Sequence, residues 1–256
     1  MKLKPASFLV LAGLVTGCAT VATQPAPVPA PPPAPAPAPE PAAVQLPDSV
    51  HWFRNSAEYR AVAVETYRAA AERLEAIVQG GISSGAWAVA LDADETVLDN
   101  SPYQKERALQ GLGYSRESWQ AWVERKEALP IPGSVVFLTR VHELGGKIAI
   151  VTNRAQEDCP ETEDNFRDRK IPYDVILCQT DTGDKGPRWK MVEEGKTAQG
   201  LPPLRILLWI GDNILDFPGV DQSLRTRPED AYKDFGVCFF VIPNPMYGSW
   251  QRNPRE

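Results

Sequence analysis

"VALDADETVLDN", residues 89–100, is the stretch that decides the fold and the candidate site. It begins with the apolar residues of a predicted buried strand and continues into four acidic residues, Asp92, Asp94, Glu95 and Asp99. Carboxylates at the end of a buried strand cost free energy unless a cation or hydrogen bonds compensate their charge. The stretch is therefore either a solvated turn or an acidic site that holds a metal ion and performs chemistry.

Short apolar segments and helical segments alternate around this stretch. Helices are predicted over 56–78, which is rich in Ala and free of Gly and Pro, and near 133–145, 158–170 and 186–195. After the strand at 86–94, four more strands are predicted: "KIAIVTN" (147–153), "YDVILCQ" (173–179), "RILLWIGD" (205–212) and "GVCFFVIPN" (236–244). The alternation predicts an α/β fold with a central parallel sheet and helices on both faces.

Residues 100–132 interrupt this alternation directly after the first strand. Trp119 and Trp122 lie there on a predicted helix. We expect this insert to form a small α-helical cap over the site.

The N-terminus has the pattern of an export signal. Lys2 and Lys4 precede the apolar run "ASFLVLAGLV", so residues 1–17 are predicted to be a signal peptide. Thr16 and Gly17 before Cys18 resemble a bacterial lipobox, in which the cysteine is acylated and becomes the new N-terminus. We expect a lipoprotein bound to the bacterial membrane, facing the periplasm or the cell surface and placed in the outer membrane. A plain signal peptide with an incidental cysteine is the alternative.

Residues 18–47 are predicted to form a lipid anchor and a linker rich in proline and alanine, including "QPAPVPAPPPAPAPAPEPAA". Such a sequence favours extended polyproline II, at about 3.1 Å per residue, and could span on the order of 90 Å. The globular domain is predicted over residues 48–256.

Charge and cysteine content exclude some functions. The chain carries 27 basic and 33 acidic residues, a net charge of -6, which argues against binding of nucleic acid polymers. Beyond Cys18, the cysteines are Cys159, Cys178 and Cys238. None has CxxC spacing, so no zinc knuckle is predicted, and an odd count leaves at least one free thiol. Whether two of them pair, and whether the chain forms a homo-oligomer, stays open.

One short motif matches a serine hydrolase pattern but lies in the wrong order of elements. "GISSG" at 81–85 matches the G-x-S-x-G pattern of serine hydrolases, but that motif follows a strand and precedes a helix, and here the order is reversed. The only histidines are His51 and His142, and His142 lies in a predicted helix as a surface or packing residue. A serine nucleophile is therefore not expected.

Polar residues follow four of the predicted strands where each strand ends. The first is followed by Asp92 and Asp94, the second by Thr152 and Asn153, the third leads to Lys185, and the fourth to Asp212 and Asp216. Because ligands of open α/β sheets bind at the carboxyl ends of the strands, these side chains are expected at one edge.

These motifs resemble those of the haloacid dehalogenase superfamily over roughly residues 86–245: D-x-D-x-T after a buried strand, T-N after the second, a lysine at a helix start, and G-D-N-x-x-D after a later strand. Three further segments, behind a lipobox, are similar to the bacterial class C acid phosphatases of the lipoprotein e family. They are "EYRAVAVETY" (58–67), "DETVLDNSPY" (94–103) and "IPNPMYGSW" (242–250).

The resemblance implies a Rossmann-like core and a role for each site residue. Asp92 is the nucleophile that forms an aspartyl-phosphate, and Asp94 is the general acid and base. Mg²⁺ is held by Asp92, the backbone carbonyl of Asp94 and Asp212, with Asp216 in support. Thr152 and Asn153 bind phosphoryl oxygens together with Lys185, which fits the pattern better than Lys190 or Lys196. Asp99 and Asn100 are expected to brace the loop, and Glu95 to be solvated.

The predicted function is a Mg²⁺-dependent acid phosphatase that hydrolyses phosphate monoesters, with nucleoside 5′-monophosphates among its substrates. Tyr103, Tyr247 and Trp250 are candidates for contacting a nucleobase, and the alternative is that all three only pack the cap and the tail. Other small esters, such as sugar or aryl phosphates, are the alternative substrates. The alternative of another class is a surface lipoprotein that binds haem or another ligand on a non-catalytic fold.

Overall fold

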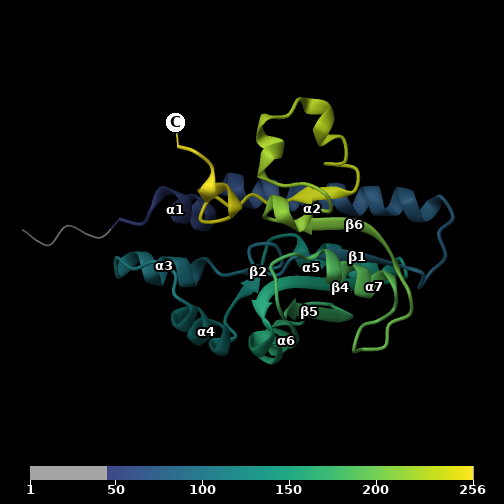
Figure 1. Cartoon of the computed structure of the whole chain (residues 1–256), viewed down its shortest axis with the longest axis horizontal. Helices are drawn as coiled ribbons and strands as arrows, with labels where there is room; N and C mark the ends of the chain where they lie inside the picture. Colours follow the sequence, from purple (N-terminus) through teal and green to yellow (C-terminus); the bar gives the residue numbers. More distant parts are fainter. Residues whose placement is uncertain (1–44, 256) are drawn as a thin grey trace, which may run out of the picture. The chain divides into compact units, whose positions relative to one another are not determined.

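The computed structural model describes residues 45–255 (Figure 1). The predicted signal peptide, Cys18 and the linker up to residue 44 lie outside the described residues. Within the described part, no helix combines the length and the apolar character that a membrane span requires.

A five-stranded parallel sheet forms the centre of the domain, as predicted. Its strands are β1 (Trp87–Leu91), β4 (Lys147–Ala155), β5 (Val175–Gln179), β6 (Arg205–Gly211) and β7 (Phe239–Val241), in the order β5-β4-β1-β6-β7. β1 pairs with β4 on one side and with β6 on the other. The residues that follow β1 therefore emerge in the middle of the sheet edge, between the ends of its two neighbours.

Helices cover both faces of the sheet, and the side chains of β1 alternate between them. Trp87, Val89 and Leu91 pack with α2 (Ala57–Gln79), α5 (Ser134–Glu143) and α6 (Cys159–Asp168). Ala88 and Ala90 pack on the opposite face with α7 (Gly186–Glu193). All five residues of β1 are buried, because successive side chains of a strand point to opposite faces and both faces are covered.

The long helix α2 matches its prediction within a residue at either end. Ser56 caps its start by accepting a hydrogen bond from the backbone N–H of Tyr59 (3.0 Å). The buried side of α2 includes Tyr67, whose hydroxyl donates to the carbonyl of Thr96 (2.7 Å) in the loop after β1. α2 thus supports the loop that carries the acidic residues. The short helix before it, α1 (Asp48–Asn55), was not predicted.

The insert after β1 is helical, as predicted. It contains α3 (Ser101–Leu109) and α4 (Arg116–Arg125), and a short antiparallel ribbon of β2 (Leu98–Asp99) and β3 (Leu129–Pro130) closes its base. Trp119 and Trp122 of α4 are both buried. In Figure 1, α3 and α4 lie beside each other near the ends of the strands.

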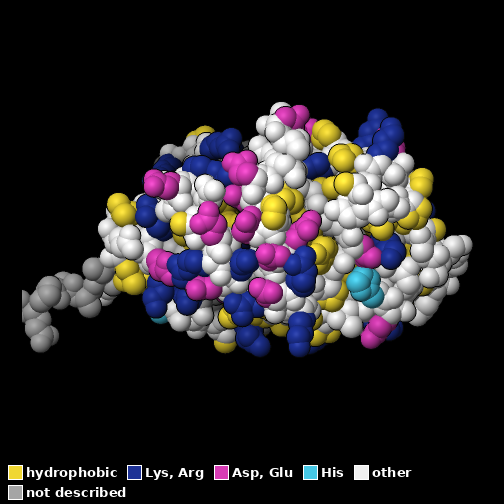
Figure 2. Space-filling view, turned by 90° about the horizontal axis from the view of Figure 1, so that it is seen from below, with side chains coloured by type: hydrophobic (Ala, Val, Ile, Leu, Met, Phe, Trp, Pro, Cys, Tyr) yellow, Lys and Arg dark blue, Asp and Glu magenta, His cyan; other side chains and the backbone are white. Residues whose placement is uncertain are grey.

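Ion pairs join this cap to α6 and to the 3₁₀ turn directly before it. Arg116 pairs with Asp158 (2.7 Å) and Lys126 with Asp164 (3.2 Å). Figure 2, which views the domain from the side of α4 and α6, shows acidic and basic side chains interspersed over this face. The cap is therefore fixed to the core by charged contacts as well as by its apolar residues.

The remaining elements are 3₁₀ turns. These are η1 (Gln156–Asp158), η2 (Ile214–Asp216), η3 (Gln222–Thr226), η4 (Glu229–Tyr232) and η5 (Ser249–Arg252). After β7 the chain returns to the sheet edge, where the side chain of Asn244 binds Asp212 and that of Ser249 binds Asn213. The C-terminal segment is thus part of the surroundings of the site.

Cys159 and Cys178 form a disulfide with a Cα–Cα distance of 6.0 Å, and Cys238 is the free thiol among the described residues. The sequence required one unpaired cysteine but left the pairing open. The disulfide joins the start of α6 to β5.

Candidate active site

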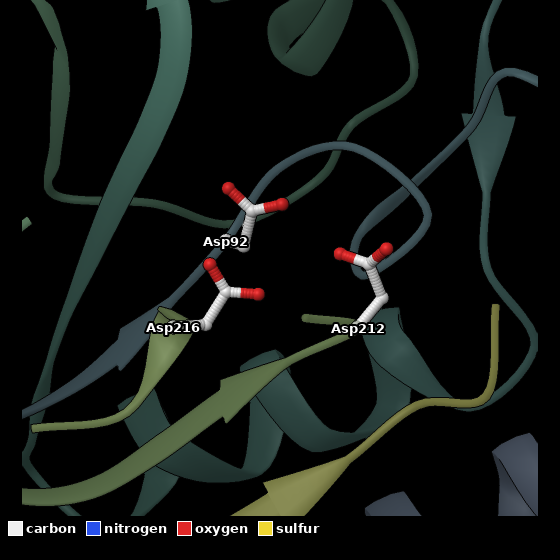
Figure 3. Close-up of side chains that lie close together, drawn as sticks. All are labelled: Asp92, Asp212 and Asp216. Atoms are coloured by element: carbon white, nitrogen blue, oxygen red, sulfur yellow. The ribbon is translucent and has the colours of Figure 1, made fainter. Parts of the chain in front are cut away.

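Three carboxylates converge at the middle of the sheet edge (Figure 3). Asp92 directly follows β1, and Asp212 and Asp216 follow the neighbouring strand β6; one oxygen of each lies within 4.8 Å of the others. Gly211 makes this approach possible, because a Cβ at that position would lie only 2.2 Å from the Cβ of Asp216. The predicted convergence of these three residues is present in the structure.

Lys185 provides the positive charge of this cluster. It precedes α7, and its Nζ lies 2.5 Å from Oδ1 of Asp92 and 2.6 Å from Oδ1 of Asp216. The lysine is buried, with 3% of its surface exposed. Lys190 and Lys196 instead pair with Glu194 at the surface. With all groups ionised, three carboxylates and one ammonium leave a net charge of -2 (-3 + 1).

Burial, and to a lesser degree the neighbouring carboxylates, raises the pKa values of Asp92 and Asp212 in this cluster. Burial raises the pKa of Asp92 to about 7, and Asp216 and Asp94 add to the rise while Lys185 opposes it. Burial, followed by the charges of Asp216 and Asp92, also raises the pKa of Asp212 well above its usual value. A hard divalent cation prefers oxygen ligands and would cancel a charge of -2. The donor set therefore fits a divalent metal ion.

Asp212 is oriented by two further side chains. Asn244 donates to its Oδ2 (2.8 Å), and the hydroxyl of Thr96 lies 3.5 Å from its Oδ1. Neither contact was predicted. Asn244 ends the last predicted strand segment, so it follows the same strand-end rule as the predicted residues, and that rule could have identified it.

Asp94 has different partners from Asp92. Its Oδ1 accepts hydrogen bonds from Nε (2.9 Å) and Nη2 (2.8 Å) of Arg154 and from Nδ2 of Asn100 (2.8 Å). Arg154 was not predicted to take part. Its position two residues after Thr152 on the same strand places both on one face, and this spacing is the signal that could have identified it.

The residues predicted to bind phosphate occupy the end of β4. Thr152 is fully buried, and its Oγ1 accepts from the backbone N–H of Arg154 (3.1 Å). The side chain of Asn153 accepts from Arg188 (2.6 Å) and donates to the carbonyl of Gly183 (3.0 Å). Asn153 therefore braces the loop before Lys185. Arg188, which also donates to the carbonyl of Thr152, was not predicted.

The prediction that Glu95 is solvated is wrong. Its exposed fraction is 0%, and its Oε1 accepts from the backbone N–H of Asn100 (2.8 Å). Burial raises the pKa of Glu95 well above its usual value, and Asp94, Asp212 and Asp99 add to the effect. The loop folds back after β1, with Glu95 at a φ of 54°, and this turns the side chain inward. The bracing roles predicted for Asp99 and Asn100 agree with their hydrogen bonds, including that from the N–H of Ser101 to Asp99 (2.8 Å).

The three candidate aromatic residues differ in their surroundings. Tyr103 is only 2% exposed, packs against Trp119 and Trp122, and shares a hydrogen bond with Ser118 (2.9 Å). For Tyr103 the geometry fits the alternative prediction, packing inside the cap, rather than contact with a nucleobase. Tyr247 is half-buried and Trp250 is 43% exposed. Both lie on the C-terminal segment that Asn244 and Ser249 hold at the site.

The chain matches the sequence model of one protein family, the HAD superfamily, subfamily IIIB (acid phosphatase), over residues 33–250. Acid phosphatase 1 of Solanum lycopersicum is 27% identical over 165 residues, which are 61% of this chain and 56% of that protein. The chain thus spans a little more than half the length of this curated relative.

Solved structures are similar over most of the chain. The class C acid phosphatase from Bacillus anthracis is 31% identical, with a TM-score of 0.71 over 80% of this chain and 85% of that one. A second crystal structure of the Bacillus anthracis class C acid phosphatase, with tungstate bound, is 29% identical and has a TM-score of 0.69 over the same shares.

Proposed function

This chain belongs to the HAD superfamily, subfamily IIIB, and we propose that it is a Mg²⁺-dependent acid phosphatase that hydrolyses phosphate monoesters through an aspartyl-phosphate. One observation carries the proposal: two aspartates after the same strand have separate environments. Asp92 lies in the carboxylate–lysine cluster, and Asp94 is held by Arg154 and Asn100. These separate environments support the proposal that Asp92 is the nucleophile and Asp94 the acid and base.

In the first step, an oxygen of Asp92 attacks phosphorus and the bond to the leaving oxygen breaks. Asp94 gives a proton to that oxygen as it leaves. The buried ammonium of Lys185 orients Asp92 and reduces its repulsion from the phosphate.

In the second step, water attacks the phosphorus of the aspartyl-phosphate and releases Asp92. Asp94, now ionised, takes the proton of that water and returns to its starting state. A carboxylate that serves first as acid and then as base needs no further proton donor, so one residue suffices for both steps.

The metal ion is proposed to be held by Asp92, the backbone carbonyl of Asp94 and Asp212, with Asp216 in support. When bound, it would offset the negative charge of the phosphoryl oxygens and of the site. Mg²⁺ fits because it is bound by a few carboxylates and otherwise keeps its waters. Asp216 also accepts from Lys185 and from the N–H of Asn213 (2.8 Å), so its support is largely indirect.

The substrates are proposed to be small monoesters, with nucleoside 5′-monophosphates preferred. Tungstate, bound in the related Bacillus anthracis structure, is a tetrahedral oxyanion like phosphate and supports oxyanion binding at this fold. Tyr247 and Trp250 near the site offer aromatic faces on which a nucleobase can stack.

The deciding experiment measures phosphate release from nucleotides, sugar phosphates and aryl phosphates, with and without Mg²⁺. We expect activity with Mg²⁺, none after exhaustive chelation, and a far higher metal requirement in Asp212→Ala. Asp92→Asn serves as the inactive control. Absence of release from every ester would favour the alternative of a ligand-binding lipoprotein, and full activity after chelation would rule out the metal.

We further propose that the chain is an exported lipoprotein anchored in the outer membrane through Cys18. Acylation of a cysteine after an export signal supplies membrane affinity. Cys18→Ser should leave the protein unprocessed or release it from the membrane fraction. Mass spectrometry of the mature protein should detect an acylated Cys18, and an unmodified N-terminus would contradict the anchor.

A further inference from the structure

All hydrogen bonds to the side chain of Asp94 meet one of its two oxygens. The three N–H groups of Arg154 and Asn100 described above all donate to Oδ1. No donor among residues 45–255 reaches Oδ2. The two oxygens of an isolated carboxylate are equivalent, but the surroundings of Asp94 make them different.

The orientation of Asn100 is fixed by two groups that can only donate. Nε1 of Trp122 donates to Oδ1 of Asn100 (2.8 Å), and Nη2 of Arg154 lies 3.2 Å from the same oxygen. With its oxygen held there, the amide group must turn its NH₂ toward Asp94. Trp122 belongs to the cap helix α4, so the cap determines how Asn100 faces Asp94.

The guanidinium of Arg154 is held from a third element. Its Nη1 donates to Oγ1 of Thr162 on α6 (3.1 Å), and its centre lies 5.4 Å from the ring of Trp119. The side chain of Arg154 is 1% exposed, and Asn100 is 0% exposed. A satisfied polar network in such a dry environment keeps one geometry.

We propose that Asn100, Arg154 and Trp122 are positioning residues through which the cap and α6 hold Oδ1 of Asp94, so that the proton of the reaction is carried on Oδ2. The inference rests on the proposed function, in which Asp94 is the general acid and base. Three donors occupy the lone pairs of Oδ1, and a protonated Asp94 must therefore carry its hydrogen on Oδ2.

The proton then has a defined path. In the first step, the Oδ2–H bond breaks and an O–H bond forms on the leaving oxygen, which keeps the electron pair of the broken P–O bond. In the second step, an O–H bond of water breaks, its proton returns to Oδ2, and the water oxygen bonds to phosphorus as the bond to Asp92 breaks. Without the network, Asp94 can rotate and present either oxygen.

Two esters with different leaving groups can show whether these residues position Asp94 or only stabilise the fold. p-Nitrophenolate leaves without a proton, whereas the alkoxide of glycerol 3-phosphate needs one. The value of kcat/KM depends only on the steps up to formation of the phosphoenzyme, which include the proton transfer to the leaving group. Its ratio between these two esters is independent of how much enzyme is correctly folded, because partial unfolding lowers both values equally.

The test uses Trp122→Phe and Asn100→Ala, which remove single members of the network. Trp209→Phe is the matched control, because the indole N–H of Trp209 is also buried but has no hydrogen-bond partner. We expect kcat/KM for glycerol 3-phosphate to fall about tenfold in each network variant, against less than twofold for p-nitrophenyl phosphate. The ratio in Trp209→Phe should equal that of the wild type.

Asp94→Asn distinguishes failure of this inference from failure of the proposed function. If Asp94→Asn changes the ratio strongly and neither network variant does, the positioning role is wrong. If Asp94→Asn itself leaves the ratio unchanged, Asp94 is not the acid and the proposed mechanism fails. A burst of p-nitrophenol in the network variants would support the inference further, because the second step would then limit turnover.

Discussion

Two aspartates with a single residue between them have opposite electrostatic surroundings. Asp92 lies with two other carboxylates; burial raises its pKa most, Asp216 and Asp94 add to the rise, and Lys185 opposes it. Asp94 instead receives hydrogen bonds from a guanidinium and an amide. Because such differences divide the roles of paired carboxylates, substitution of each by asparagine should give a different kinetic defect.

Asp92→Asn should abolish turnover, because an amide does not attack phosphorus. Asp94→Asn should bind substrate nearly normally and lose about 10²–10⁴-fold in rate on esters with poor leaving groups. Steady-state kinetics and acid quenching with a phosphate-labelled substrate would measure both defects. Asp99→Asn is the control, since Asp99, at the end of β2, accepts a hydrogen bond from the backbone N–H of Ser101 at the start of α3. Near-normal turnover in either catalytic variant would contradict the assignment.

The residues that converge at the site could be predicted from the sequence, but most of their hydrogen-bond partners could not. Asp92, Asp212 and Lys185 follow or approach strand ends, and the parallel sheet brings strand ends together whatever the side chains do. The direction of a long side chain depends on packing that no local pattern contains. The spacing of Arg154 from Thr152 indicates its face of the strand, but its contact with Asp94 was missed for this reason. Glu95 was placed in solvent because the sequence does not reveal the turn that folds it inward.

At the scale of elements, one carboxylate joins the starts of two strands. Asp174 precedes β5 and accepts hydrogen bonds from the N–H of Ile148 on β4, from Lys147 and from His142, each at 2.8 Å. Burial alone would raise the pKa of Asp174, but these hydrogen bonds outweigh it and hold the pKa below its usual value. The ionised carboxylate therefore stabilises the fold.

A lowered pKa fixes the sign of the pH dependence. The contribution of Asp174 is fully present above its unfolded pKa of about 3.9 and is lost as the pH falls through the lower folded value. Asp174→Asn should lower the free energy of unfolding by about 1–3 kcal/mol at pH 6, and by less at pH 3. Urea unfolding at both values would measure this. The exposed Asp168→Asn should change stability by less than about 0.5 kcal/mol, and an equal effect of both variants would contradict the role.

The disulfide holds the start of α6, the helix whose Thr162 accepts a hydrogen bond from Arg154. Cys159 and Cys178 are 19 residues apart, and closing a loop of this size stabilises a fold by about 3 kcal/mol. The double variant Cys159→Ala/Cys178→Ala should therefore unfold at lower urea concentration. A reducing agent should shift the wild type in the same direction and leave the double variant unchanged. Cys238→Ala is the control, and an identical midpoint for oxidised and reduced wild type would contradict the prediction.

For the whole molecule, the α/β architecture was predictable because it depends on composition along whole segments. Strand segments buried on both faces are apolar throughout, and the helices between them are long enough to show their own pattern. α1 has eight residues, too few for a clear pattern, and it was not predicted. The return of the C-terminal segment to the sheet edge was expected from its place after the last predicted strand, but its contact through Asn244 with Asp212 was not predicted.

The C-terminal segment carries the residues that we expect to determine substrate selectivity. Phosphate contacts are common to all monoesters, so selectivity must come from groups that meet the rest of the substrate. Asn244 and Ser249 attach this segment to Asp212 and Asn213. Between them, Gly248 has a φ of 153°, a conformation that few other residues adopt, and it sets the turn that carries Tyr247.

Tyr247→Ala should therefore raise KM for a nucleoside 5′-monophosphate about tenfold, since stacking on one aromatic ring is worth ~1–3 kcal/mol per base. KM for glycerol 3-phosphate, which has no base, should change much less. Tyr232→Ala removes an exposed tyrosine on η4, and it should leave both values unchanged. An equal rise for both substrates in Tyr247→Ala would mean that the ring packs the C-terminal segment in place, since a misplaced Asp212 would weaken every phosphate ester alike.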